Sequence, residues 1–355
     1  MQLSCWPRVG AAAVSFRGSR VYLALIHRQQ RWQRRWLIAL SLLVLSLFLL
    51  SLALGEFVLL PWQPLGELEL RILLELRLPR ALLALLAGAA LACGGAVLQV
   101  MLHNPVAVPG LLGVSSGAGL AAMVAMAVAK SLGIYLPGWG LSLASFGGAL
   151  VVTMLLIHLA RRARLGHTRL LLFGVAIGIL TNAAMTWLMY FADDGSLREF
   201  MFWMMGSLSY GSQQLAWWWL VLPLTLGWLC WQGRALQQLL LGETQARLMG
   251  MNVDRMRVRL VLAVCLLTGV AVSLCGVIGF VGLVVPHLLR LCGGSDQRFL
   301  LPASALGGGA LLLGADLVAR SALQAGELPI GVITASVGAP LFIYLLLRQD
   351  ADVSR

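Results

Sequence analysis

The chain has 355 residues, of which 60% are hydrophobic and only 11% are charged, and its mean hydropathy is +0.88. Soluble globular domains carry about 25% charged residues, so the composition excludes that class and predicts a polytopic membrane protein. The formal net charge of +12 comes from arginines scattered at the ends of apolar runs, which favours the positive-inside rule over a nucleic-acid-binding face.

The first 35 residues are rich in arginine, and their apolar patches are shorter than the roughly 7-residue core that a signal peptide needs. We therefore expect a cytoplasmic N-terminal extension over residues 1–35 that is disordered in part. Its first twenty or so residues are either a true extension or the product of a start codon placed too early. An uncharged run of membrane length follows at residues 36–54.

Nine further apolar runs predict membrane spans, at residues 81–102, 111–128, 141–160, 170–191, 215–231, 260–274, 276–291, 300–319 and 330–347. Together with the first run they predict an all-α polytopic membrane protein with about ten transmembrane helices. The transmembrane domain is expected over residues 36–348, with a cytoplasmic segment at 234–258 inside it and a cytoplasmic tail at 349–355.

Arginines gather on one side of the predicted spans. They follow spans four, six and eight and the last span, at Arg161, Arg162, Arg164, Arg169, Arg234, Arg247, Arg255, Arg257, Arg259, Arg290, Arg298 and Arg348. Because positive residues accumulate on the cytoplasmic side of membrane proteins, both chain termini are expected in the cytoplasm. The loops on the opposite side carry charges of both signs.

A glycine spacing of seven residues occurs twice, at Gly88 and Gly95 and again at Gly269 and Gly276. The two segments enter the membrane from opposite sides in the predicted topology, which suggests an inverted repeat of the kind that many transporters have. Glycine also favours close helix packing in lipid, so packing alone remains an alternative explanation.

A polar segment inside residues 234–258 has the pattern of a short helix. Gly242 ends the preceding apolar run, and Glu243 places a carboxylate in the first helical turn. Arg247 lies four residues on as its expected ion-pair partner, and Gly250 can end the helix in the left-handed conformation. Small Ala246 in mid-helix is expected to let another surface come close. So short a helix is marginal alone in water, which predicts a partner; a plain solvated loop helix is the alternative.

Four motifs resemble one known family. The pattern Gly242-Glu243-x-x-Ala246-Arg247-x-x-Gly250, with Met249 where leucine is usual, resembles the coupling segment in the permease subunits of type II ABC importers, the iron-siderophore, haem and vitamin B12 group. The same permeases are matched by Arg77-Leu78-Pro79-Arg80 with the later Asn104-Pro105-Val106-Ala107-Val108-Pro109-Gly110, by Gly279-Phe280-Val281-Gly282 through Pro286-His287, and by Gly326-Glu327-Leu328-Pro329. Val106 stands where leucine is usual and Val108 where an acidic residue is common.

The resemblance implies a type II importer permease fold and a homodimer that encloses the transport pathway. It implies two ATP-binding cassette ATPase subunits that use ATP and magnesium, a periplasmic substrate-binding protein, and a place in the bacterial inner membrane among membrane lipid. The single lysine, Lys130, is not part of a Gly-x-x-x-x-Gly-Lys loop, so the chain itself is expected to be no enzyme and to bind no cofactor. Nucleic acid is not an expected partner.

The resemblance also implies roles for single residues. ATPase coupling is implied for Gly242, Glu243, Ala246, Arg247, Met249 and Gly250. Docking of glutamates of the binding protein is implied for Arg77, Arg80 and Arg320, and the planar guanidinium suits that task. Pairing within the chain, for instance with Glu75 or Glu327, or contact with phosphate headgroups is the alternative.

A cytoplasmic gate is implied for Asn104, Val106, His167 and Thr168, although His167 replaces a hydroxyl residue that relatives carry. A tight turn with no gating role is the alternative for Asn104 and Val106. His287 lies in a motif without a second histidine, cysteine or carboxylate at ligand spacing, which predicts a structural histidine and no metal site. The six cysteines likewise lack the spacing of a disulfide framework or a zinc site.

Methionines and aromatic residues are dense between Met185 and Met205, as an interfacial belt or as an adaptable wall for a bulky ligand. Within the family, Met185-Thr186-Trp187 and Phe202-Trp203-Met204-Met205-Gly206 are most similar to the vitamin B12 permeases. We therefore expect import of vitamin B12 from periplasm to cytoplasm, with ferric siderophore or haem as the alternative cargo. An ion-coupled secondary transporter is a remote alternative, since it would need charged residues in mid-span, where Asp316 is the main candidate.

Overall fold

The computed structural model describes residues 11–54, 66–162, 167–209, 218–322 and 327–353, and this part of the chain is helical without a strand. Its helices are α1 (Ala11–Ala53), α2 (Glu67–Arg71), α3 (Leu78–Met101), α4 (Val114–Ser131), α5 (Gly138–Arg162), α6 (His167–Phe191), α7 (Asp194–Met204), α9 (Trp218–Trp231), α10 (Gly233–Leu240), α11 (Glu243–Leu248), α12 (Val253–Cys275), α13 (Val281–Gly293), α14 (Gln297–Ser321) and α15 (Ile330–Val353). A π-helical stretch, η1 (Ile72–Arg77), joins α2 to α3, and a 3-10 turn, η2 (Pro109–Leu112), precedes α4.

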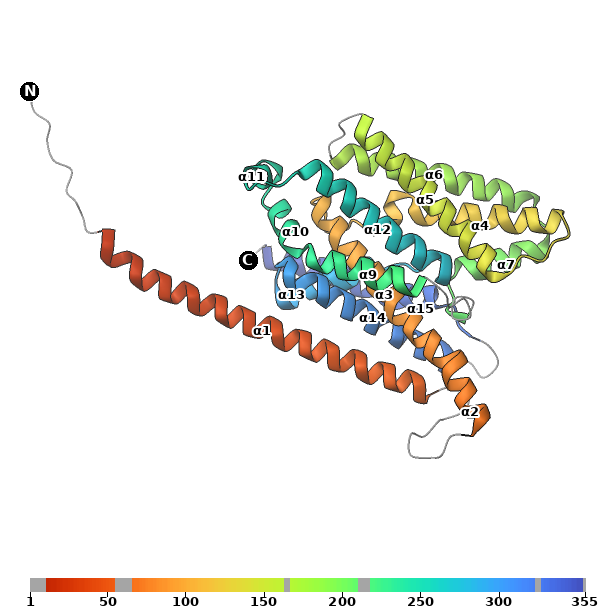
Figure 1. Cartoon of the computed structure of the whole chain (residues 1–355), viewed down its shortest axis with the longest axis horizontal. Coiled ribbons are helices and arrows are strands. Elements are labelled where there is room, and N and C mark those ends of the chain that lie inside the picture. Colours follow the sequence, from red (N-terminus) through yellow and green to blue (C-terminus); the bar gives the residue numbers. More distant parts are fainter. Residues whose placement is uncertain (1–10, 55–65, 163–166, 210–217, 323–326, 354–355) are drawn as a thin grey trace, which may run out of the picture.

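Seven of the described helices are long and apolar enough to cross a membrane, namely α1, α3 with the stretch before it, α4, α5, α6, α12 and α14. Three shorter apolar helices, α9, α13 and α15, complete a set of ten, and each coincides with one of the ten predicted spans. The predicted all-helical polytopic fold is therefore confirmed. In Figure 1 the helices lie alongside one another, with α11 and the end of α15 at one end of the bundle and α2 at the other.

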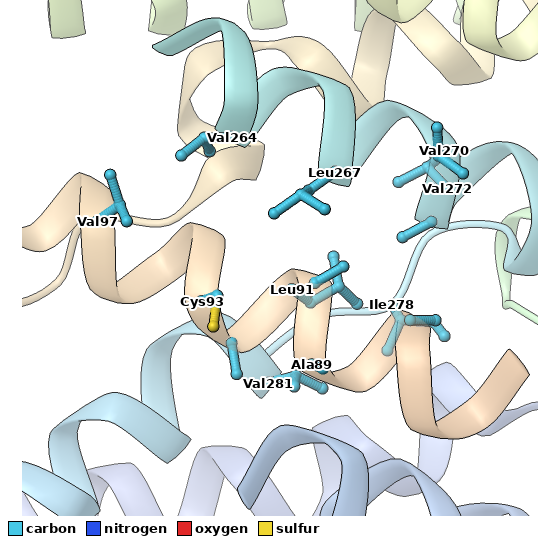
Figure 2. Packing of buried hydrophobic residues seen from close by; sticks show 14 of the residues in the cluster. Ala89, Leu91, Cys93, Val97, Val264, Leu267, Val270, Val272, Ile278 and Val281 are labelled. Atoms are coloured by element: carbon cyan, nitrogen blue, oxygen red, sulfur yellow. The ribbon is translucent and has the colours of Figure 1, made fainter. Parts of the chain in front are cut away.

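Helix α3 is the centre of the bundle, because 83% of its most apolar window is buried and it packs against α1, α9, α10, α12, α13 and α14. Alanine and glycine fill much of it, and a methyl group added at Gly88 or Gly95 would overlap the backbone of Gly308 or Gly282. Such close backbone approach gives helices van der Waals contact in lipid, where no hydrophobic effect drives them together. Figure 2 shows Leu91 of α3 directed toward Leu267 of α12 in the buried layer between these helices.

Of the second glycine pair, Gly269 lies on α12 and Gly276 directly follows it; 78% of the most apolar window of α12 is buried, and the helix runs antiparallel to α3 (Figure 1). Gly269 faces Phe146 and Ala149 of α5, whereas Gly276 faces the backbone of Trp203. Three of the four glycines thus serve close packing within antiparallel helices, and Gly276 serves it in the turn after α12. The inverted repeat itself remains a prediction.

Three details of the described helices add to or differ from the expectation. Helix α1 continues through residue 35 without a break, so secondary structure does not mark the end of the predicted extension, whose residues 1–10 lie outside the described part. Span eight begins at Val281 rather than at residue 276, because Gly276, with φ of +71°, turns the chain out of α12. An unpredicted helix, α7, follows α6; the carboxylate of Asp193 caps it by accepting hydrogen bonds from the backbone N–H groups of Gly195 and Ser196.

Candidate functional site

Helix α11 projects at one end of the bundle, where Figure 1 shows it apart from the other helices. It spans Glu243–Leu248, as the sequence predicts. Gly242 precedes it with φ of +107° and Gly250 follows it with φ of +84°, two conformations that other residues rarely adopt. Both glycines are therefore required by the turns that bracket this helix.

Two ion pairs connect α11 to the start of α12, and neither is the predicted one. Arg257 of α12 binds the carboxylate of Glu243, and Arg247 lies 3.2 Å from the carboxylate of Asp254. The expected pair between Glu243 and Arg247 is thus wrong, since each side chain finds its partner on the neighbouring helix. These two contacts hold α11 to the helix that follows it.

Apolar side chains are exposed on both sides of α11 along the chain, before it and at its end. Leu248 is 83% exposed, and Met249 and Leu241 are more than half exposed. Ala246 is fully buried in its own chain, so the expectation that Ala246 lets a partner surface come close is corrected. Sequence reasoning missed Leu248, although a leucine at the end of a polar two-turn helix was the signal that could have found it.

The turn before α4 is held by its own backbone and by Asn104. The side-chain oxygen of Asn104 accepts a hydrogen bond from the N–H of Val106 at 3.0 Å, and its carbonyl accepts one from the N–H of Ala107 at 3.1 Å. His103 before it has a positive φ of 48°. Val106 is 40% exposed at the tip, so the turn presents an apolar side chain on a rigid support.

Helix α6 begins at His167, and the side chains of His167 and Thr168 lie outside the described residues. The turn η2 packs on α6, and a methyl group at Gly113 would come within 3.1 Å of the carbonyl of Gly174. The structure therefore brings the Asn104 turn and α6 together through η2. Whether His167 and Thr168 face that turn remains a prediction.

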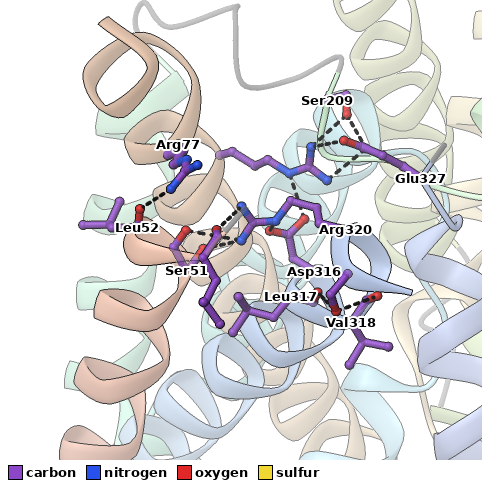
Figure 3. A network of polar contacts seen from close by, with 12 residues as sticks. Ser51, Leu52, Arg77, Ser209, Asp316, Leu317, Val318, Arg320 and Glu327 are labelled. Atoms are coloured by element: carbon purple, nitrogen blue, oxygen red, sulfur yellow. Dashed lines mark hydrogen bonds and ion pairs between the residues drawn. The ribbon is translucent and has the colours of Figure 1, made fainter. Parts of the chain in front are cut away.

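A polar network at the opposite end of the bundle contains all three predicted docking arginines, of which Figure 3 labels Arg77 and Arg320. Asp316 of α14 has no exposed surface and lies between two guanidinium groups, 2.8 Å from Arg80 Nε and 3.0 Å from Arg320 Nε. The first contact is a hydrogen bond, and the second is an ion pair without hydrogen-bond geometry. A buried carboxylate is stable only with such compensation.

Arg80 also binds Glu327 through both of its terminal nitrogens, one of them at 2.9 Å, and Glu327 accepts a further hydrogen bond from Ser209 at 2.7 Å. The pKa of Glu327 lies below its usual value, because hydrogen bonds from Arg80 and Ser209 outweigh the partial burial that would raise it. Pairing within the chain, named above as the alternative for these arginines, is thus what the structure shows for Arg80.

Arg77 and Arg320 fix the end of α1. Arg77 is only 7% exposed and donates to the carbonyl groups of Leu52 at 2.8 Å and Ala53 at 3.0 Å. Arg320 donates to the carbonyl and the hydroxyl of Ser51. Both arginines therefore contribute to the packing of α1 against α3 and α14, whatever else they bind.

The methionine and aromatic segment is divided between two faces. Met185 and Trp203 are buried against α4, where their side chains lie near Gly119. Trp187, Tyr190 and Phe191 are each at least two thirds exposed and contact one another by stacked and edge-on ring packing. The buried half is thus structural, and the exposed half is the part that can meet lipid, ligand or a second chain.

His287 is buried in α13. Its ring packs edge-on with that of Phe342 of α15, and the two ring centroids are 5.9 Å apart. Among the described residues no group of three histidine, cysteine, aspartate or glutamate side chains is placed to hold a metal ion. This packing suits the structural role predicted for His287.

Ten apolar helices around a backbone-packed centre, with a short helix exposed at one end, define a polytopic membrane permease. The chain belongs to the FecCD transport family, whose sequence model matches residues 37–348. As a member of that family it is a transmembrane permease subunit and not a catalytic one.

Relatives and a solved structure agree with this assignment. The chain is 49% identical over 331 residues to the vitamin B12 import system permease protein BtuC of Klebsiella pneumoniae, covering 92% of this chain and 98% of the relative. It is 50% identical over 332 residues to the protein of that name from Serratia proteamaculans, covering 93% and 98%. A solved inward-facing ABC transporter of metal-chelate type has a TM-score of 0.78 at 30% identity, covering 89% of this chain and 99% of that one.

Proposed function

We propose that this chain is the permease of an ATP-driven importer that moves vitamin B12 across the bacterial inner membrane into the cytoplasm. The observation that carries the cargo is an identity of about one half, over more than nine tenths of both chains, to relatives that are vitamin B12 import permeases. The partners of such a complex are a second copy of the chain, two ATPase subunits and a periplasmic binding protein. In this arrangement α11 and both termini face the cytoplasm.

The end of α11 is the proposed contact for the ATPase. Leu248 at the end of α11, Met249 after it and Leu241 before it expose apolar surface, and the ion pairs of Glu243 and Arg247 connect the helix to α12. Apolar side chains exposed outside the membrane spans favour a protein partner, because contact of apolar surface with water is unfavourable. Gly242 and Gly250 shape the helix, and the pairs of Glu243 and Arg247 would pass its displacement to α12.

The exposed face of α6 is the proposed lining of the dimer and its pathway. Only 17% of the most apolar window of α6 is buried within the chain. Its exposed side chains include Ile179, Leu180 and the aromatic residues Trp187, Tyr190 and Phe191. A second copy would cover this face. The exposed rings would then form the adaptable wall that a bulky corrin ring needs.

At the periplasmic end of the bundle, a carboxylate of the binding protein would replace a carboxylate of this chain on the docking arginine. Arg80 already holds Glu327, whose side chain is 43% exposed, so a glutamate of the binding protein can compete for the same guanidinium. Arg77 and Arg320 are less suited, because they hold the end of α1. On the inner side, Val106 at the tip of the Asn104 turn is the proposed gate element.

Ferric siderophore or haem is the second candidate cargo, because the similar solved structure is of metal-chelate type. An ion-coupled transporter is disfavoured, because Asp316 is neutralised by two arginines. The test is ATP-dependent uptake of labelled cyanocobalamin into proteoliposomes that hold the permease, its ATPase and a B12-binding protein, with ferric siderophore as competitor. Uptake that siderophore does not reduce supports the proposal, and an active complex without B12 uptake refutes the cargo.

A further inference from the structure

An open groove of about 530 Å³ lies on the outside of the bundle between α5, α9 and α12. Its floor is α12, with Leu262, Ala263 and Leu266, and its walls come from α5 and α9. Helix α9 lines it with Leu224, Thr225 and Trp228. Its volume lies within the roughly 300–1,000 Å³ range of small-molecule sites.

The lining is almost wholly apolar and carries a single charge, Arg259. Within the described part of the chain Arg259 makes no hydrogen bond and no ion pair, whereas Arg257 is held by Glu243 and Asp254 by Arg247. Arg255, one turn earlier on the same side of α12, is exposed and also has no described acidic partner. The end of the groove nearest α11 is therefore positively charged and uncompensated.

The depth of the groove suits one membrane leaflet. Arg259 lies in the second turn of α12, close to α11, and the floor continues to Leu266, about 10 Å farther along a helix that rises about 1.5 Å per residue. Half of a bilayer core of about 30 Å is about 15 Å. Arginine at the polar boundary with an apolar channel beyond it is the arrangement that a phospholipid fits.

We propose that this groove binds an anionic glycerophospholipid, with its phosphate on Arg259 and one acyl chain along α12 between α5 and α9. The planar guanidinium can hold a phosphate by two hydrogen bonds, and Arg255 adds a second positive charge that selects an anionic headgroup. The lipid would fix the start of α12 close to Arg257, which holds α11. The proposal does not depend on the identity of the cargo.

The test is photolabelling of the purified permease–ATPase complex with a phosphatidylglycerol that carries a photoactivatable acyl chain, followed by peptide mapping. Labels are expected on α5, α9 and α12 at the groove residues. Native mass spectrometry of Arg259→Gln should show at least a tenfold loss of retained phosphatidylglycerol relative to phosphatidylethanolamine. Arg298→Gln, which removes an exposed arginine at the same end of the bundle but on α14, should retain as much lipid as the wild type.

Thr225→Phe narrows the groove from its half-buried wall without a change of charge, so it decides the question if Arg259→Gln fails to fold. It should reduce labelling of α12 several-fold. Labels spread evenly over other helices, or equal lipid loss in Arg259→Gln and Arg298→Gln, would overturn the proposal. So would competition by glycerol phosphate alone, or a cross-link from the groove to a second copy of the chain.

Discussion

The most direct test of the coupling surface is the substitution Leu248→Ala at the end of α11. Leu248 is 83% exposed in the permease, so its removal leaves the fold of the permease almost untouched. If the ATPase covers this side chain, the contact gains the burial of a leucine, which is about 1.5–3 kcal/mol. A loss of about 2 kcal/mol corresponds to about a 30-fold rise in the Kd of the ATPase.

The assay is titration of labelled ATPase onto permease in nanodiscs. Leu132→Ala is the matched control, because Leu132 is also a strongly exposed leucine but lies after α4 at the opposite end of the bundle. Ala246→Trp would be a poor substitute, since Ala246 is buried and a tryptophan there would unfold α11 itself. An unchanged Kd in Leu248→Ala, with the complex still active, would refute the proposed contact.

Three further predictions concern the bundle itself. Asp316→Asn removes the buried anion between Arg80 and Arg320 and leaves Arg80 with Glu327 alone, so the free energy of unfolding should fall by about 3–5 kcal/mol in thermal denaturation; an unchanged midpoint would contradict the network. Because the pKa of Glu327 is lowered in the folded state, the group contributes its full stabilisation above the usual glutamate pKa of about 4.3 and loses it as the pH falls through the lower folded value. Melting curves between pH 3 and 7 should show this loss in the wild type and not in Glu327→Gln. Gly88→Ala should destabilise by about 1–3 kcal/mol through overlap with α14, whereas Gly147→Ala, with open space at its Cα, should be neutral or stabilising; equal midpoints for the two would contradict the packing.

The ten spans were predictable from sequence because they depend on local apolar content alone. The backbone N–H and C=O groups of a span must form hydrogen bonds within the protein, because the bilayer core offers no water. An apolar run of membrane length therefore predicts an α-helix. The exceptions are informative: α7 is amphipathic and lies outside any apolar run, and the chain between Cys275 and Val281 is apolar but not helical. There Gly276 packs on the backbone of Trp203, a contact that no local pattern announces.

Side-chain partners were less predictable, because they depend on which helices meet. Arg247 satisfied the four-residue rule with Glu243, yet the start of α12 offered Asp254 and Arg257 instead. Ala246 has the size that a partner contact requires but faces inward. Arg80 and Glu327, 247 residues apart in the chain, could be named only as one alternative among several.

The glycine crossings of α3 determine which parts of the permease can move. Where Gly88 meets Gly308 and Gly95 meets Gly282, main chain touches main chain, so there are no rotamers through which the contact could adjust. Helices α3, α13 and α14 should therefore move together as one rigid body during the transport cycle. Bending should then fall on helices that pack less closely, such as α6, of whose most apolar window only 17% is buried within the chain.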